Sequence, residues 1–134
     1  MSERERNRGA VAAAFEAFQH GDVEAVNAGL DPEIEVVISD RLANSGTWSG
    51  IEGFWESVSS WLEAWDEYRI DVESIETPDD EHVVVEARQT ATGRSSGVPV
   101  ELTTYFVFWV DDGISKRYEL HASREDAIAA IARH

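Results

Sequence analysis

Apolar residues recur in the first part of this chain at the spacing of a helix. Val11, Phe15 and Phe18 follow one another at intervals of four and three residues, so they form one apolar face. This spacing predicts an amphipathic helix over Arg4–Gln19. A second, short helix is expected over Val23–Leu30. The Asp31-Pro32 pair that follows it should end the helix.

A period of two replaces the helical period further along. From Ile34, apolar and polar residues alternate and predict a half-buried strand, and Arg69–Glu76 repeats the pattern. The longest such region, Glu81–His121, holds three runs rich in Val, Thr, Tyr, Phe and Trp, separated by clusters of Gly, Ser and Asp. These runs predict three antiparallel strands of about 10 residues each, long enough to twist and curl.

A third helix is predicted over Ile51–Trp65, between a glycine-rich loop and the second strand. Phe54, Val58, Trp61 and Trp65 form its apolar stripe. So many large rings on one helix need a broad apolar partner. The concave side of the curled sheet is the partner that the pattern offers.

A closing helix over Ser123–Ile131 completes the predicted order α-α-β-α-β-β-β-β-α. Because helices and strands do not alternate regularly, the order argues against a parallel α/β fold. It favours an α+β domain in which one bent antiparallel sheet wraps around helices.

The middle long strand has large apolar residues on both of its faces. Two arrangements are therefore open. In one, Tyr105 and Trp109 point to the concave side of the sheet, and in the other Phe106 and Phe108 do.

Composition excludes several classes of function. The chain of 134 residues fits a single domain over residues 1–134, and its net charge of −16 argues against nucleic acid and anionic membranes as partners. It has no cysteine and no apolar run long enough to span a membrane, and its charged start is unlike a signal peptide, so we expect a cytoplasmic protein. None of the histidines has a partner at metal-ligand spacing, so we predict no metal and no cofactor.

Six short motifs occur in an order and spacing typical of one superfamily. They are Gly21-Asp22-Val23-Glu24, Asp31-Pro32-Glu33-Ile34, Trp48-Ser49-Gly50-Ile51-Glu52-Gly53, Arg94-Ser95-Ser96-Gly97-Val98, Val110-Asp111-Asp112-Gly113-Ile114 and the terminal Ser123–Ile131. Over about Val11–Ile131 the chain thus resembles the nuclear transport factor 2-like superfamily, in its SnoaL-like, polyketide-cyclase-like branch.

The resemblance implies a cone-shaped domain. In it, a curved antiparallel or mixed sheet and three helices enclose a pocket that is open at one end. Such domains are commonly homodimers that pair through the sheet. The superfamily includes ketosteroid isomerases, polyketide cyclases, dehydratases and epoxide hydrolases, so the fold alone does not decide the function.

Asp40 is the main candidate for a catalytic group. It lies two residues after Ile38 and so shares the apolar face of the strand, and we expect its carboxyl to lean toward the pocket. Desolvation there would raise the pKa of Asp40 and suit it to general acid or base catalysis. By resemblance it lies near the base of the isomerases. The alternative is a turn-capping Asp. Phe15 and Phe18 occupy the helix on which the isomerases carry a hydrogen-bonding tyrosine, and neither ring can donate.

His121 and Tyr105 are the other two catalytic candidates. By resemblance, His121 lies near a position where cyclases of this branch use an acidic residue or a histidine, although a surface histidine is the alternative. Tyr105 either hydrogen-bonds a ligand or lies at a dimer interface. Arg88 either contacts the ligand or pairs with charges on neighbouring strands. The predicted ligand-binding residues are Phe15, Phe18, Trp48, Phe54, Trp55, Trp61, Arg88 and Trp109.

These residues support three hypotheses about function. The first is an isomerase- or cyclase-type enzyme that acts on an apolar carbonyl compound, with Asp40 as base and Tyr105 or His121 holding the oxygen. The others are a non-catalytic domain that binds a small apolar ligand, and a pure dimerisation domain. A cavity of about 300 Å³ or more, lined by Asp40, would favour the first two. We also expect a homodimer, because the helices can cover only one face of the apolar strands.

Overall fold

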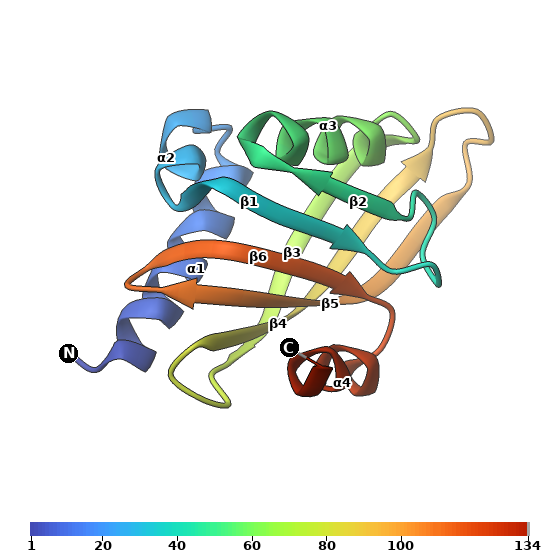
Figure 1. Cartoon of the computed structure of the whole chain (residues 1–134). Helices are drawn as coiled ribbons and strands as arrows, with labels where there is room; N and C mark the ends of the chain where they lie inside the picture. Colours follow the sequence, from blue (N-terminus) through green and yellow to red (C-terminus); the bar gives the residue numbers. More distant parts are fainter. Residues whose placement is uncertain (134) are drawn as a thin grey trace.

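The computed structural model describes residues 1–133 and shows a curved mixed sheet with helices packed on it (Figure 1). The sheet has six strands in the order β2-β1-β6-β5-β4-β3, and only the β1–β6 pair is parallel. The predicted α+β fold class is confirmed. The elements are α1 (Glu3–Gln19), α2 (Val23–Ala28), β1 (Leu30–Ile38), β2 (Gly46–Ser49), α3 (Gly50–Leu62), β3 (Trp65–Glu76), β4 (His82–Gly93), β5 (Pro99–Asp111), β6 (Ile114–His121) and α4 (Arg124–Arg133).

The main core lies between the concave face of the sheet and helices α1, α2 and α3. Val11 and Phe15 of α1 and Phe54 of α3 belong to one buried cluster with Ile34 of β1 and Val85 of β4. Helix α4 contacts β4, β5 and β6 and lies apart from the other helices (Figure 1). The sheet is thus covered on its concave side by α1–α3 and in part of its convex side by α4.

The structure decides which face of β5 is concave. Phe106 and Phe108 meet the ring of Phe15 edge to face, at centroid distances of 5.2 and 5.9 Å. Tyr105 and Trp109, in the alternate phase, therefore point to the convex side. Both faces of this strand are apolar because both are covered.

Several boundaries differ from the sequence-based prediction, and one strand was missed. Helix α3 ends at Leu62, and Trp65, predicted to close it, begins β3 instead. Strand β1 begins at Leu30 and runs through the Asp-Pro pair that was expected to precede it. The short strand β2, inside the predicted loop, pairs with β1 and was missed.

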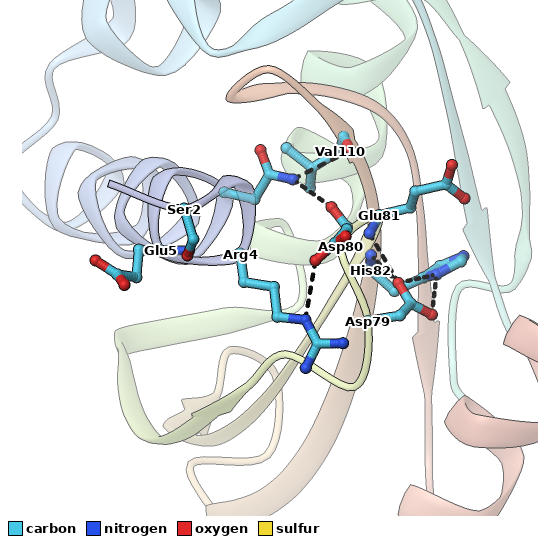
Figure 2. A network of polar contacts seen from close by, with 9 residues as sticks. Ser2, Arg4, Glu5, Asp79, Asp80, Glu81, His82 and Val110 are labelled. Atoms are coloured by element: carbon cyan, nitrogen blue, oxygen red, sulfur yellow. Dashed lines mark hydrogen bonds and ion pairs between the residues drawn. The ribbon is translucent and has the colours of Figure 1, made fainter.

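The turn before β4 anchors the N-terminal end of α1 (Figure 2). Arg4 pairs with Asp80 at 3.0 Å, and the Asn7 amide donates to the Asp80 carbonyl at 2.8 Å. Asp79 accepts hydrogen bonds from the backbone N–H of Glu81 and of His82, and contacts the His82 ring at 2.8 Å. These contacts fix the helix that carries the aromatic wall of the cavity described below.

The expected uncovered apolar face is not found among residues 1–133. The large hydrophobic side chains that are exposed there are Met1, Val23 and Val98, none of which lies in the middle of the sheet. The convex surface that α4 leaves open carries charged pairs, such as Arg88 with Glu73. This observation gives the expected homodimer no support, and the dimer stays a prediction. No helix in the described part of the chain is long and apolar enough to cross a membrane.

Candidate functional site

An apolar chamber of about 110 Å³ lies between the helices and the concave face of the sheet. Among residues 1–133, no aspartate, glutamate, histidine, lysine or arginine lines it. Its wall is built by α1, α2, α3 and strands from both halves of the sheet: Ala14, Phe15, Phe18, Val26, Leu30, Ile38, Phe54, Ser57, Val58, Trp61, Leu62, Tyr68, Ile70, Gln89, Phe106, Phe108, Ser115, Tyr118 and Leu120.

Helical spacing explains how α3 supplies one side of the chamber. Phe54, Val58 and Trp61 follow at intervals of four and three residues, so all three face the sheet. Phe15 and Phe18 of α1 lie in the wall for the same reason. Four of the predicted ligand-binding residues thus lie around the chamber.

A hydrogen-bonded network gives this apolar chamber one polar wall. The Gln89 side chain accepts from the Trp61 indole N–H at 2.9 Å and from the Tyr68 hydroxyl. Its amide nitrogen donates to the Thr104 hydroxyl at 2.8 Å. Gln89 and Thr104 are 4% and 0% exposed, so these groups depend on one another for their hydrogen bonds.

A bulge in β3 directs Tyr68 into this network. The pairing of β3 with β4 shifts between Asp66 and Arg69, and Glu67 has a φ of 52°. A left-handed conformation is unfavourable for a residue with a Cβ, and bulges re-aim side chains. The backbone therefore accepts local strain where Tyr68 enters the chamber wall.

A second phenol, Tyr118, lies in the wall near Ser57. Burial raises the pKa of Tyr118, and its hydrogen bond with Ser57 only partly offsets that effect. Burial likewise raises the pKa of Tyr68. The Ser57 hydroxyl also donates to the Phe54 carbonyl at 2.6 Å. Both phenols are therefore neutral at physiological pH.

A wider vestibule of about 500 Å³ opens beside the chamber. The two spaces are adjacent, because they share wall residues from α1, α2, α3 and β3: Phe18, Val26, Val58, Leu62, Tyr68 and Ile70. Among the described residues, charged side chains line only the vestibule, where Asp22, Arg69 and Asp71 lie. Arg69 and Asp71 pair with each other at 3.1 Å. The site thus becomes more polar from the chamber outward.

Asp40 does not lie where the sequence predicted. Ile38 lines the chamber, but Asp40, two residues later, is exposed and lines neither space. Strand β1 ends at Ile38, and a turn follows in which the Leu42 N–H donates to the Ser39 carbonyl at 3.0 Å. Because the strand phase ends before Asp40, its carboxyl does not lean toward the pocket.

The other two catalytic candidates lie on the convex face. Tyr105 pairs in register with His121, opposite in phase to the chamber residues Phe106 and Leu120. Two of the predicted ligand-binding residues share that face. Trp109 lies under the Arg117 guanidinium, 5.5 Å from the ring centroid, and Arg88 pairs with Glu73 and Glu101. The structure does not bring these four residues into the chamber.

His121 belongs to a buried ionic cluster on the convex side. Its ring contacts Glu119 at 2.9 Å, and Glu119 accepts from Arg117 at 2.8 Å. Burial alone would raise the pKa of Glu119, but the hydrogen bonds from Arg117 and His121 lower it below its ordinary value. The cluster keeps the buried Glu119 carboxylate ionised and links three side chains of β6 on the convex side of the sheet.

Of the remaining two predicted residues, Trp55 lines the vestibule and Trp48 lines neither space. Trp48 is half-buried against Gly53, where an added Cβ would come within 3.3 Å of its side chain. Trp55 lines the vestibule and donates its indole N–H to Asn27 at 2.7 Å.

The sequence-based prediction missed Gln89 and Tyr68. The position of Gln89 in its strand could have identified it. Gln89 continues the alternating apolar series Val83, Val85 and Ala87, which lies on the concave face of β4. A polar residue in such a series marks a buried hydrogen-bonded group. Tyr68 lies just before the predicted start of its strand, so no phase was assigned to it.

No group of three or more histidine, cysteine, aspartate or glutamate residues in the described part of the chain could hold a metal ion. The residues of the chamber wall offer hydrogen bonds and apolar contacts instead.

Solved structures share this fold across nearly the whole chain. A protein of unknown function from Burkholderia pseudomallei K96243 is 21% identical, with 96% of this chain and 97% of that chain covered and a TM-score of 0.76. TerC, crystallised with polyporic acid, is 20% identical over 96% and 99%, with a TM-score of 0.77. A protein from Jannaschia sp. CCS1, provisionally described as a SnoaL-like polyketide cyclase, is 19% identical over 97% and 94%, with a TM-score of 0.76. At these identities the likeness shows the fold alone.

No curated protein matches the chain. The SnoaL-like domain model, in contrast, matches residues 11–118, most of the chain and nearly all of the elements that build the chamber. This chain therefore has the fold of NTF2-like proteins and belongs to the SnoaL-like domain family.

Proposed function

We propose that this protein binds a small, apolar organic molecule built around one ring. The ring lies in the chamber, and the remainder of the molecule extends into the vestibule. The observation that carries the proposal is an apolar cavity with one polar wall, made by Trp61, Tyr68 and Gln89. Ligand sites commonly combine an apolar lining with a few polar groups that orient the ligand.

The size of the chamber limits the ligand. An engineered apolar cavity of about 150 Å³ binds benzene, and this chamber has about 110 Å³. One ring therefore fills it, and any larger molecule must use the vestibule of about 500 Å³. Two half-buried residues that line both spaces, Phe18 and Tyr68, lie between them, where such a molecule would have to pass.

Binding is better supported than catalysis. The chamber wall holds no side chain that exchanges a proton near neutral pH, which an isomerase or cyclase using general acid/base catalysis requires. Such an enzyme would have to draw its carboxylate from the vestibule, from Asp22 or Asp71. That TerC, a protein of the same fold, was crystallised with the organic compound polyporic acid agrees with a small-molecule ligand.

Toluene is a direct probe of the chamber, because it offers one ring and no polar group. A ligand that binds only the folded state raises the midpoint of thermal unfolding in proportion to its affinity and concentration. We expect toluene to raise the midpoint of the wild-type protein. Ala14→Leu, which adds three carbons inside the chamber, should abolish that rise.

Ala13→Leu is the matched control. It makes the same change one residue away on α1, at an exposed position that does not line the chamber. Toluene should stabilise this variant as it stabilises the wild type. Equal stabilisation of all three proteins would place the toluene elsewhere and overturn the proposal, as would no stabilisation of the wild type.

A further inference from the structure

The polar wall of the chamber has a fixed hydrogen-bond direction, and this direction limits the ligands that it can accept. The direction starts from Trp61, because an indole N–H can donate a hydrogen bond but cannot accept one. Its partner atom on Gln89, at 2.9 Å, must therefore be the amide oxygen. The amide nitrogen then faces the Thr104 hydroxyl at 2.8 Å, as it does in the structure.

The orientation of Gln89 also fixes the Tyr68 proton. An amide oxygen carries no hydrogen, so Tyr68 must donate to it. Thr104 accepts from Gln89 and directs its own proton to the Ala87 carbonyl, at 3.5 Å. The chain of donors thus runs in one direction, from the tyrosine through the amide and the threonine to a backbone carbonyl.

What this wall still offers to a ligand is an acceptor. Tyr68 has used its single proton, and its oxygen also accepts from the Trp61 indole, which lowers the Tyr68 pKa, so one lone pair of the oxygen remains for a ligand. The competing group is the second amide proton of Gln89, but Gln89 is 4% exposed whereas Tyr68 is half-buried and lines both the chamber and the vestibule. Tyr68 is therefore the more accessible of the two groups from the vestibule.

The second phenol of the chamber, Tyr118, hydrogen-bonds with Ser57, whose hydroxyl donates to the Phe54 carbonyl at 2.6 Å. Burial raises the pKa of both tyrosines, which shows that the chamber disfavours a phenolate. The same environment disfavours an ionised ligand.

We infer that Tyr68 makes the chamber selective for a neutral ring compound that carries an O–H or N–H donor, such as a phenol or a cyclic alcohol, over the corresponding aldehyde or ketone. This inference rests on the proposed function, since it names the ligand class of the same chamber. It differs from the carbonyl compound that the sequence suggested, because a carbonyl oxygen can only accept. Tyr68 acts here as a specificity-determining residue.

Three one-ring probes separate the possibilities. Phenol carries a donor, benzaldehyde carries only an acceptor, and toluene carries neither. Their affinities for the wild-type protein, Tyr68→Phe and Tyr118→Phe can be measured by calorimetric titration. In Tyr68→Phe we expect the affinity for phenol relative to toluene to fall about fivefold, the size of one ordinary hydrogen bond. The affinity for benzaldehyde relative to toluene should not change, and Tyr118→Phe should keep the wild-type ratios.

The outcomes distinguish this inference from the function on which it rests. If toluene binds the wild type but not Ala14→Leu, while Tyr68→Phe leaves the phenol ratio unchanged, the chamber binds rings and the inference is wrong. A loss of benzaldehyde affinity in Tyr68→Phe would show that Tyr68 donates, and a loss of phenol preference in Tyr118→Phe alone would assign the acceptor to Tyr118. Either result overturns the inference. Failure of toluene to bind the wild type would overturn the proposed function itself.

Discussion

Replacement of Gln89 by leucine tests whether the polar wall of the chamber is formed as described. Leucine has nearly the same length and is apolar, so the change removes hydrogen bonds and leaves little new empty space. Gln89 bonds to three side chains: the Trp61 indole, the Tyr68 hydroxyl and the Thr104 hydroxyl. In Gln89→Leu all three lose this partner at once.

The structure sets the expected magnitude. A buried hydrogen bond stabilises a protein by a net of about 1 kcal/mol, so three of them predict a loss of about 3 kcal/mol in the free energy of unfolding. Gln19→Leu is the matched control. The Gln19 side chain is exposed and donates one hydrogen bond, to the Ile70 carbonyl at 2.7 Å. Its replacement should cost less than about 1 kcal/mol.

Urea denaturation of the three proteins, followed by circular dichroism, measures both differences. The slope of the free energy against urea concentration should stay the same, so that a shift in the midpoint reports stability. If Gln89→Leu costs no more than Gln19→Leu, the network around Gln89 does not exist in solution, and the argument for the direction of the Tyr68 proton fails with it.

Four further predictions concern the core, the convex face and assembly. Phe54→Ala removes a buried ring of the chamber wall and should cost about 3–5 kcal/mol in chemical denaturation, so a loss below about 1 kcal/mol would contradict the placement of α3. Glu119→Gln should cost about 1.5–3 kcal/mol at pH 7, because hydrogen bonds to a charged group are lost. The pKa of Glu119 is lowered in the folded state, so its contribution is present above the unfolded value of about 4.3 and is lost as the pH falls through the folded pKa. The difference between wild type and Glu119→Gln should therefore shrink below about pH 4, and a difference independent of pH would refute the ionic role. Asp40→Asn, at an exposed position, should change stability by less than about 0.5 kcal/mol at pH 7, and a clear loss would show that Asp40 caps its turn. We expect a homodimer in sedimentation experiments, and a mass near the monomer value of 14.9 kDa at micromolar concentration would contradict this.

Periodicity predicted most of the fold, because helices and strands with one buried face show it directly in the sequence. It failed where an element is short or carries a local irregularity. Strand β2 has four residues, too few for a period to be recognised. The aromatic stripe of α3 continues to Trp65 in the sequence, yet the helix ends at Leu62. The bulge at Glu67 then changes the phase of β3, which no regular pattern contains.

The site was harder to predict than the fold, because it depends on which face of a strand is concave. On β5, Val107 points to the convex side of the sheet and is 0% exposed, and Phe108 points to the chamber and is 7% exposed. Because both sides of the strand are covered, its two faces are equally apolar in the sequence. The aromatic residues of α1 and α3 were identified because a helix has only one buried face. Whether Tyr105 and Trp109 face the pocket stayed open in the sequence, because a strand covered on both sides has two such faces.

A crystal structure of the wild-type protein soaked with phenol tests the account most directly. We predict that the ring lies in the chamber, bounded by Phe15, Phe54 and Trp61, with its hydroxyl about 2.7–2.8 Å from the Tyr68 oxygen. Phenol bound only on the convex face, or an empty chamber at a phenol concentration that stabilises the protein, would contradict the central claim that this chamber is the ligand site.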